Sequence, residues 1–299
     1  MQTQAATRSF RLTHPDRVLY PEQGLTKADL ARYYALVAER MLEHVAERPL
    51  MLVRCPEGAG AQCFHQKHPT RGISRDIVRV PIMENSGAST EHMMVRDARG
   101  LIALVQVGAL EIHTWGSRAD QLDYPDQLTF DLDPDVGLPW PRMIEAARTV
   151  RKQLEALGLP CFLKTTGGKG LHIVTPIEPS TPWDDAKLFC RAVAELIVRA
   201  EPNKYVANIS KAKRKGKVLI DYLRNGRGAT AVAAYSTRAR AGAPVAAPIG
   251  WNELTEKLRP DAFTIENMAA RLKRQRRDPW SGFGKTRPAL PGVRASQHA

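Results

Sequence analysis

Two aspartates separated by one residue, Asp131 and Asp133, are the first candidates for chemistry in this sequence. Polar and apolar residues alternate from Leu128 to Asp133, which predicts a strand with both carboxylates on one face. Two neighbouring carboxylates repel each other unless a cation or a proton lies between them. The pair is therefore a candidate half of a magnesium site. The alternative is a strand end whose acids face solvent before the turn at Pro134.

A third acid, Asp221, lies in the apolar run Val218 to Leu223. A carboxylate buried there would be costly without a partner. Phosphoryl and nucleotidyl transfer use two divalent ions held mainly by carboxylates, so we expect Asp221 to be the third ligand. The alternative is an alternating strand with Asp221 on the solvent face.

The glycine-rich segment from Thr165 to His172 joins two predicted strands, so it is predicted to be a hairpin turn. It has neither of the glycine patterns that open a phosphate-binding helix. Thr166, Lys169 and His172 nevertheless combine a hydroxyl, an ammonium and an imidazole with flexible backbone amides, a combination that suits a triphosphate. A glycine hairpin without a ligand is the alternative.

Other cationic and aromatic residues give weaker signals. His113, two residues after Glu111, would alone be read as structural. Arg214 and Arg238 add positive charge near the predicted acidic strands, which favours an anionic substrate, although such residues are usually solvated. The segment from Phe64 to His68 mixes an aromatic ring with polar and cationic neighbours, as in base stacking with phosphate contacts; a hydrophobic anchor in a polar loop is the alternative.

The charge balance favours a polyanionic partner. The 299 residues contain 44 Lys and Arg against 31 Asp and Glu, a net charge of +13, which is typical of proteins that meet nucleic acid or an anionic membrane surface. No segment is long and apolar enough to span a bilayer, and the N-terminus lacks the apolar stretch of a signal peptide. We expect a cytoplasmic protein that meets nucleic acid and no membrane.

The four cysteines form no Cys-x-x-Cys pair, so neither a disulfide framework nor a zinc ribbon is predicted. Cys55, Cys63, His65 and His68 offer four possible zinc ligands, but their spacing matches no zinc pattern.

Strands and helices alternate along the chain, which predicts a mixed α/β fold. The length allows one large domain or two intimate lobes. The predicted strands are 10–12, 50–54, 77–81, 93–96, 111–115, 128–133, 161–164, 173–175, 218–222 and, as the last core strand, 231–235. The predicted helices are 26–46, 101–109, 140–157, 182–199, 251–258 and 265–277. Residues 1–12 are expected to be an N-terminal arm and 285–299 a flexible basic tail.

Three motifs occur in order: Asp-Leu-Asp-Pro from residue 131, Lys-Thr-Thr-Gly-Gly-Lys-Gly-Leu-His from 164, and Leu-Ile-Asp-Tyr-Leu-Arg-Asn from 219. Glu-Ile-His-Thr-Trp from 111 and Phe-His-Gln-Lys-His from 64 add agreement. Together they resemble the archaeo-eukaryotic primase superfamily and, more closely, the polymerase domain of bacterial ATP-dependent DNA ligase D. The resemblance covers about Thr13 to Gly282.

The resemblance implies a primase-like catalytic core of strands flanked by helices, in two closely packed lobes, within residues 13–284. It implies a template-directed, primer-extending nucleotidyltransferase that fills gaps and extends ends in double-strand-break repair by non-homologous end joining, favouring ribonucleotides. It also implies two Mg²⁺ or Mn²⁺ ions as cofactors, NTP or dNTP as substrates, and DNA with 5′-phosphorylated gaps or overhangs as the partner. Ku and a ligase module are implied partners, and the bacterial nucleoid is the implied location. No Lys-x-Asp-Gly motif occurs, so nick sealing is not expected.

Carried over position by position, the resemblance assigns three groups of residues. The metal ligands would be Asp131, Asp133 and Asp221, and the nucleotide would meet His113, Thr166, Lys169, His172, Arg214 and Arg238. DNA would meet Arg17, Lys27, Arg54, Phe64 and Lys67, with Lys27 at a helix start whose amides also favour anions. Thr166 replaces a usual serine and His65 a common second aromatic.

Two other functional classes use the same features. One is a metal-dependent nuclease or phosphohydrolase in which water replaces the 3′ hydroxyl. The other is a DNA-end binding module with an inactive site.

Overall fold

The computed structural model describes residues 12–84 and 87–292 and has the predicted mixed α/β architecture. The chain divides into two compact units. Unit 1 contains residues 1–114, 232–246 and 263–276, and unit 2 contains residues 115–231, 247–262 and 277–299. The strand predicted at 10–12 lies outside the described residues, except for Leu12, as does most of the predicted N-terminal arm.

Unit 1 is built on a sheet with the strand order β13-β7-β3-β6-β5, to which β4 adds by pairing with β3. Unit 1 contains the strands β1 (Val18–Tyr20), β2 (Leu25–Thr26), β3 (Leu50–Arg54), β4 (Phe64–Gln66), β5 (Val78–Met83), β6 (Ser89–Met94) and β7 (Ala109–Trp115), of which β1 and β2 form a separate two-stranded sheet. The boundary between the units falls at the end of β7 and within β13 (Thr230–Val232). The helices of unit 1 are α2 (Lys27–Val45), α3 (Ala98–Gln106), α6 (Ile265–Arg274) and the 3₁₀ turn η1 (Pro21–Gln23). The predicted capping box at Thr26 is present, because Thr26 and Asp29 exchange side-chain and backbone hydrogen bonds.

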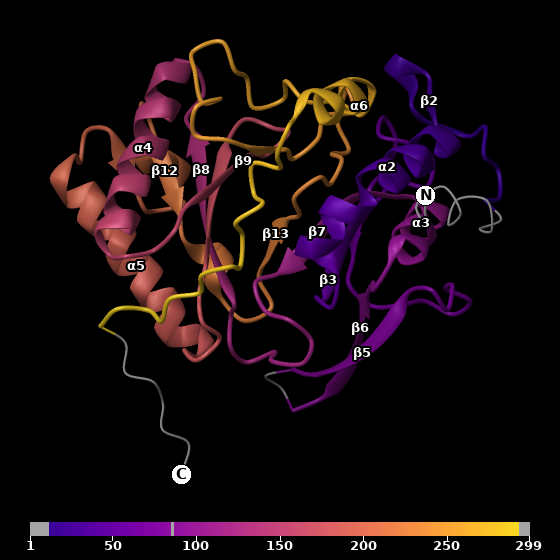
Figure 1. The fold of residues 1–299 in the computed structure, drawn as a ribbon, viewed down its shortest axis with the longest axis horizontal. Helices are drawn as coiled ribbons and strands as arrows, with labels where there is room; N and C mark the ends of the chain where they lie inside the picture. Colours follow the sequence, from indigo (N-terminus) through magenta and orange to yellow (C-terminus); the bar gives the residue numbers. More distant parts are fainter. Residues whose placement is uncertain (1–11, 85–86, 293–299) are drawn as a thin grey trace. The chain divides into compact units, whose positions relative to one another are not determined.

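Unit 2 is built on a sheet with the strand order β11-β12-β8-β10-β9-β14. Its strands are β8 (Gln127–Pro134), β9 (Phe162–Thr165), β10 (Leu171–Pro176), β11 (Tyr205–Val206), β12 (Val218–Asp221) and β14 (Pro248–Ile249). Its helices are α4 (Trp140–Ala156), α5 (Trp183–Ala200) and the 3₁₀ turns η2 (Lys211–Lys213) and η3 (Leu223–Asn225). The long helices α4 and α5 lie side by side and pack against this sheet (Figure 1).

The central strand β8 separates the core of unit 2 from its polar face. Leu128, Phe130 and Leu132 are fully buried. Because neighbouring residues of a strand point to opposite faces, Asp131 and Asp133 lie on the other side. The alternation predicted from the sequence is therefore confirmed.

Two predicted elements differ in the structure. Residues 251–258 form turns and not a helix, because their backbone hydrogen bonds, such as Glu253 N to Gly250 O and Leu258 N to Thr255 O, close separate turns and do not continue into a helical series. The strand predicted at 231–235 ends at Val232, and Tyr235 has a left-handed φ of 66°. It is not the last strand either, because β14 follows it and pairs with β9.

The segment predicted as a flexible tail packs on unit 2 over its described part. Arg287 pairs with the buried Asp126 at 2.9 Å, Pro288 accepts the Glu178 amide, and Leu290 is buried. Residues 293–299 lie outside the described residues.

The prediction of no disulfide is wrong at one position, because Cys55 and Cys63 are bonded to each other. They lie at the two ends of the loop that joins β3 to β4, with their Cα atoms 4.4 Å apart. The pairing removes both sulfurs from the zinc site considered for this region. Within the described residues, no helix is long and apolar enough to cross a membrane.

Candidate active site

A row of buried polar side chains crosses the unit 2 sheet at one level. Asp131 of β8 lies between Asp221 of β12 and His172 of β10, directly opposite both. His172 is in turn opposite Lys164 of β9. Directly opposed residues share a face of a sheet, so the strand register brings these side chains together, and all of them are buried.

The three aspartates lie close enough to perturb one another. Asp133 is two residues beyond Asp131 on the same strand and is half-buried. Burial raises the pKa of Asp133, and the charges on Asp131 and Asp221 raise it further. Burial also raises the pKa of Asp221, with a smaller contribution from Asp131. Burial opposes ionisation of Asp131 as well, but His172, Arg224 and Lys164 hold its pKa at about 2. A bound cation would relieve this concentration of negative charge.

The two ring nitrogens of His172 differ in their surroundings, because one contacts Asp131 and the other is buried without a hydrogen-bond partner. Its Nε2 lies 3.2 Å from Asp131 Oδ1. Burial outweighs the attraction of Asp131 and lowers the pKa of His172 to about 4, with Lys164 acting in the same direction. The ring is therefore neutral near pH 7. Its Nδ1 is buried and has no hydrogen-bond partner among the described residues, and leaving such an atom unpaired costs about 1–3 kcal/mol.

Arg224 is a cation that the sequence reasoning missed. Its Nε lies 3.4 Å from Asp131 Oδ2 and 3.7 Å from Asp221 Oδ2. The next residue, Asn225, fixes the turn η3 to β8, since its side chain accepts the Thr129 amide at 2.7 Å and donates to the Thr129 carbonyl at 2.8 Å. The signal was present in the third motif, because Arg224 follows Asp221 by three residues in a turn.

The glycine hairpin between β9 and β10 is held by the hydroxyl of Thr166. Thr166 Oγ1 donates to the Gly170 carbonyl at 3.1 Å and accepts the amides of Gly168 and Gly170, both at 3.3 Å. The hydroxyl expected at a triphosphate thus also organises the turn. Lys169 is exposed.

Gly170 presses this hairpin onto β8. A Cβ at Gly170 would lie 2.2 Å from the Leu132 carbonyl oxygen and 3.2 Å from Asp133 Oδ1. No side chain fits at that distance, so a glycine is required for the turn to approach the acidic residues. Arg214, which follows η2, reaches the same acids, with its NH2 3.9 Å from Asp133 Oδ2.

The remaining predicted nucleotide residues, His113 and Arg238, lie together in unit 1. Both contact Glu111 of β7, with His113 Nε2 at 2.8 Å and Arg238 Nε at 3.0 Å. The sequence reasoning noted Glu111 beside His113 but gave it no role.

Arg17 and Lys27 are neighbours at the start of α2. Lys27 is buried and donates to the Thr13 carbonyl at 3.0 Å. Burial and then the charge on Arg17 lower the pKa of Lys27. The sequence analysis expected the amides at the start of this helix to attract an anion. The amides of Lys27 and Ala28 are not available for that, because they donate to the carbonyls of Arg17 and Pro15.

Arg54 and Phe64 are paired across β3 and β4, and the Arg54 guanidinium lies 5.3 Å from the centre of the Phe64 ring. Phe64 is 42% exposed, so its ring is available for a stacking partner. Lys67, just beyond β4, lies 3.4 Å from Glu84.

The chemistry of the three aspartates fits a hard divalent cation, which prefers carboxylate oxygens. The side chains as they stand do not enclose one, because no set of three acidic, histidine or cysteine side chains in the described part of the chain could hold a metal ion. His172 and Arg224 contact Asp131 instead.

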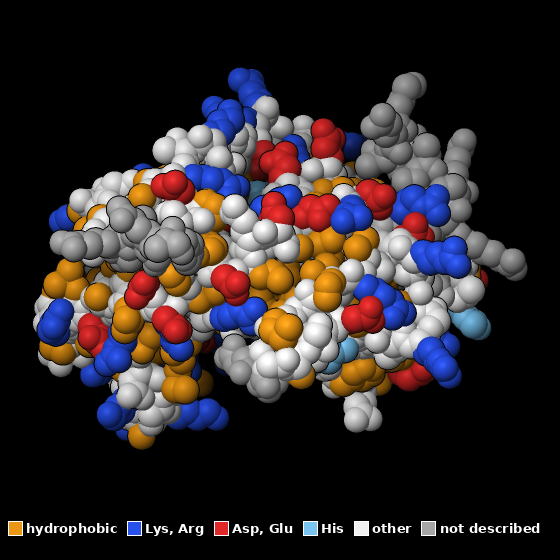
Figure 2. Space-filling model, turned by 90° about the horizontal axis from the view of Figure 1, so that it is seen from below, with side chains coloured by type: hydrophobic (Ala, Val, Ile, Leu, Met, Phe, Trp, Pro, Cys, Tyr) orange, Lys and Arg blue, Asp and Glu red, His pale blue; other side chains and the backbone are white. Residues whose placement is uncertain are grey.

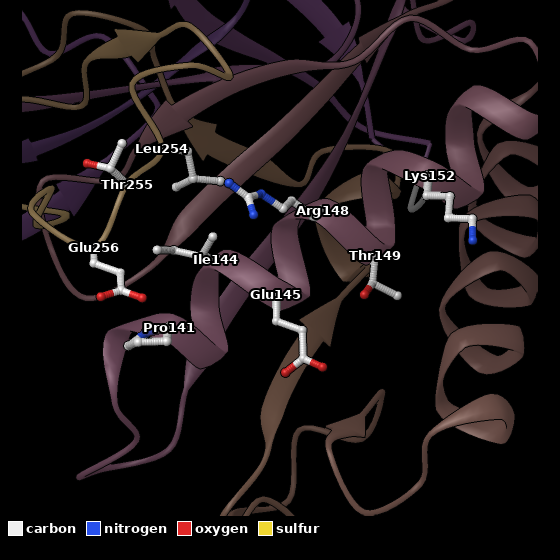
Figure 3. A pocket seen from close by; sticks show the side chains of 9 residues that line it. All are labelled: Pro141, Ile144, Glu145, Arg148, Thr149, Lys152, Leu254, Thr255 and Glu256. Carbon is white, nitrogen blue, oxygen red and sulfur yellow. The ribbon is translucent and has the colours of Figure 1, made fainter.

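A groove of about 540 Å³ lies elsewhere in unit 2, between α4 and residues 254–256 (Figure 3). Arg148 and Lys152 line it together with Glu145 and Glu256, and none of the predicted site residues does. On the molecular face in Figure 2, lysine and arginine side chains are interspersed with acidic and hydrophobic ones, so that face carries no continuous basic patch.

The family model that describes the LigD primase-polymerase domain matches residues 26–280. The chain belongs to this family. The match includes the acidic row, the glycine hairpin and the Glu111 contacts. It excludes Arg17, which lies before the matched range.

Known relatives and a solved structure agree with this assignment. The chain is 38% identical over 296 residues to the multifunctional non-homologous end joining protein LigD of Pseudomonas aeruginosa and 36% identical over 260 residues to that of Mycobacterium bovis. These matches cover 99% and 84% of this chain but only 35% and 34% of the relatives. The chain thus spans about a third of their length. The polymerase domain of Mycobacterium tuberculosis ligase D, solved in complex with DNA, matches with a TM-score of 0.84 and 33% identity, over 89% of this chain and 95% of that one.

Proposed function

We propose that residues 13–284 form a template-directed, primer-extending nucleotidyltransferase that fills gaps and extends DNA ends during non-homologous end joining. Membership of the primase-polymerase family supports this function. The observation that carries it for this chain is the register of β12, β8 and β10, which sets Asp221, Asp131 and His172 side by side.

Asp131, Asp133 and Asp221 would hold Mg²⁺ or Mn²⁺. When bound, such ions lower the pKa of an attacking hydroxyl and offset the charge of the leaving pyrophosphate. The raised pKa values of Asp133 and Asp221 support this assignment, because burial and mutual repulsion disfavour their charges without a cation. Arg224 contacts two of these carboxylates and would balance part of the charge.

The nucleotide, a ribonucleotide by preference, would lie against the glycine hairpin. Lys169 and Arg214 supply positive charge for a triphosphate, and Thr166 holds the hairpin amides in place. The unpaired Nδ1 of the neutral His172 is an acceptor for a hydroxyl group of the substrate or a bound water. In unit 1, His113 and Arg238 would also bind nucleotide.

DNA would be held by residues of unit 1. Arg17 and Lys27 place two like charges next to each other, an arrangement that a 5′-phosphate would stabilise. Arg54, Phe64 and Lys67 would hold the template strand by stacking and phosphate contacts. Ku and a ligase module would act with this domain at the bacterial nucleoid.

The test is primer extension on a gapped duplex with a 5′-phosphate, supplied with nucleotides and Mn²⁺. We expect the wild type to lengthen the primer and Asp131→Asn to lose this activity while still binding the DNA. Asp120→Asn, at an acid whose side chain is 76% exposed, is the control and should extend normally. Shortening of the primer would identify a nuclease, and retention of DNA without any turnover would identify a binding module; either result overturns the proposal.

A further inference from the structure

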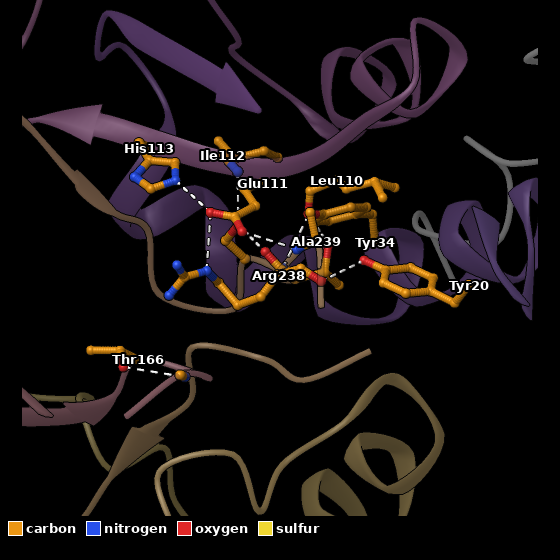
Figure 4. A network of polar contacts seen from close by, with 12 residues as sticks. Tyr20, Tyr34, Leu110, Glu111, Ile112, His113, Thr166, Arg238 and Ala239 are labelled. Atoms are coloured by element: carbon orange, nitrogen blue, oxygen red, sulfur yellow. Dashed lines mark hydrogen bonds and ion pairs between the residues drawn. The ribbon is translucent and has the colours of Figure 1, made fainter. Parts of the chain in front are cut away.

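Glu111 is a buried carboxylate that binds three donors in unit 1 (Figure 4). Its Oε2 lies 2.8 Å from His113 Nε2 and 3.0 Å from Arg238 Nε, and its Oε1 accepts the Ala239 amide at 2.9 Å. It lies on β7 between Leu110 and Ile112, which are fully buried. Glu111 and His113 are two residues apart on the strand and therefore point to the same face.

The segment that carries Arg238 is fixed along the same strand. The hydroxyl of Ser236 accepts the Ile112 amide at 2.8 Å, and that of Thr237 donates to the Leu110 carbonyl at 2.5 Å. The Arg238 carbonyl accepts the hydroxyl of Tyr20 at 3.0 Å. The backbone at Arg238 is thus held close to β7 on both sides of Glu111.

Glu111 remains charged in spite of its burial. Burial alone would raise its pKa, but hydrogen bonding from His113 and the charge on Arg238, together with the Ala239 amide, hold the pKa at about 2. An ionised carboxylate only accepts hydrogen bonds, so His113 Nε2 and the Ala239 amide must each direct a proton towards it, while the Arg238 guanidinium pairs with it by charge. Glu111 therefore determines which nitrogen of His113 carries the proton and which side of the Arg238 guanidinium faces the protein.

We propose that Glu111 is a positioning residue, which holds His113 in the tautomer protonated on Nε2 and orients Arg238 so that both meet the triphosphate of the nucleotide in one arrangement. The claim about nucleotide binding rests on the proposed function, whereas the claim about the His113 tautomer rests only on the contacts of Glu111. Stability of the fold alone does not explain a carboxylate at this position, since apolar residues of similar volume often stabilise a protein at least as much as a buried ion pair does.

The first measurement is of the tautomer in the protein without substrate. The ¹⁵N chemical shifts of the His113 ring, assigned by comparison with His113→Gln, should show Nε2 protonated in the wild type. Glu111→Gln keeps the size of the side chain but has one oxygen and no charge, so it cannot accept from His113 and Ala239 and pair with Arg238 as the carboxylate does. We expect this variant to show a mixture of tautomers or the opposite one. Asp126→Asn is the matched control, because Asp126 is also buried and paired with an arginine but belongs to unit 2 and is not one of the proposed site residues.

The second measurement is of primer extension by the same proteins. We expect Glu111→Gln to raise the KM for the nucleotide about tenfold, the lower end of the effect seen when a residue that orients a metal-binding histidine is lost. The apparent affinity for DNA should change little. Asp126→Asn should leave the nucleotide KM and the His113 tautomer as in the wild type.

The outcomes separate the two claims. A wild-type His113 protonated on Nδ1 would overturn the inference, even if Glu111→Gln fails to fold. An unchanged nucleotide KM in a folded Glu111→Gln, accompanied by a lower Tm, would also overturn it and leave Glu111 as a structural residue. Absence of extension by the wild type, with the expected tautomer change in the variant, would refute the proposed function while confirming that Glu111 controls His113.

Discussion

Replacing Asp221 with asparagine should stabilise the metal-free protein and remove its response to manganese. Asp221 lies directly opposite Asp131, which puts their Cβ atoms about 5 Å apart, and we take this as the separation of the two charges. At an effective dielectric constant of about 20, two like charges at that separation repel by roughly 3 kcal/mol. The asparagine oxygen can still accept the Leu223 amide, which Asp221 accepts at 2.8 Å.

Part of that gain is lost with the attraction to Arg224, whose Nε is 3.7 Å from Asp221. Because the Arg224 side chain is 44% exposed, this loss is at most about 1 kcal/mol. The net gain should be roughly 1–2 kcal/mol, or a rise in Tm of about 2–4 °C. The pKa of Asp221 is raised in the folded protein, so its charge reduces stability at neutral pH. The advantage of the variant should therefore shrink as the pH falls through that raised pKa and disappear once the pH is below the ordinary carboxyl pKa of 3.8.

Scanning calorimetry in EDTA and in Mn²⁺ checks both parts. Manganese at about 100 times its Kd should stabilise the wild type by roughly 2.7 kcal/mol and should leave Asp221→Asn nearly unchanged. Asp120→Asn removes an exposed acid and should behave as the wild type under both conditions. The reasoning is refuted if Asp221→Asn is less stable than the wild type in EDTA, or if manganese raises its Tm to the same extent.

Three further predictions concern separate features. Lys27→Met, which keeps most of the buried stem, should abolish any preference for 5′-phosphorylated over unphosphorylated gaps in anisotropy titrations at fixed salt; a wild type without that preference would contradict the assignment. Gly170→Ala should cost about 1–3 kcal/mol in denaturant unfolding, because its Cβ would lie 2.2 Å from the Leu132 carbonyl, and unchanged stability would mean that the hairpin can move away. Reducing the Cys55–Cys63 bond, which closes a loop with a sequence separation of 8, should cost roughly 2–3 kcal/mol, whereas the Cys63→Ser variant should not respond to the reductant.

Gly60→Ala provides the control for the glycine prediction. A Cβ at Gly60 would meet only the Pro21 side chain, at 4.0 Å. Its effect should stay within about 0.5 kcal/mol, as for most substitutions in open space.

The sequence predicted those features that depend on neighbouring residues. Alternation in Leu128 to Asp133 gave the strand β8 and put both acids on one face, and the glycine run gave the β9–β10 hairpin. The sequence grouped Asp221 with the other two acids through its apolar surroundings and the family resemblance, but could not predict its position directly opposite Asp131, since strands 90 residues apart are brought together by the sheet and not by any local pattern. Lys164 and Arg224 were overlooked for the same reason.

Local sequence patterns also failed to predict short or irregular elements. β14 is only two residues long, too short for a periodicity to appear. The apolar residues of 251–258 were read as a helix, yet Trp251 donates to the Cys161 carbonyl at 2.9 Å and Leu254 is buried without helical hydrogen bonding. The role of Glu111 could not be predicted either, because its partner Arg238 follows it by 127 residues and reaches it only in the folded unit.

The unbroken register of β8 restricts how this chain can change in length. β8 pairs continuously with β10 from Gln127 to Leu132 and with β12 from Asp131 to Pro134. Because side chains alternate strictly, one residue inserted between Leu128 and Asp131 would turn both acids into the apolar core and expose Leu132 in their place. Insertions and deletions should therefore be tolerated in the loop after Pro134, whereas active variants should keep the length of this strand.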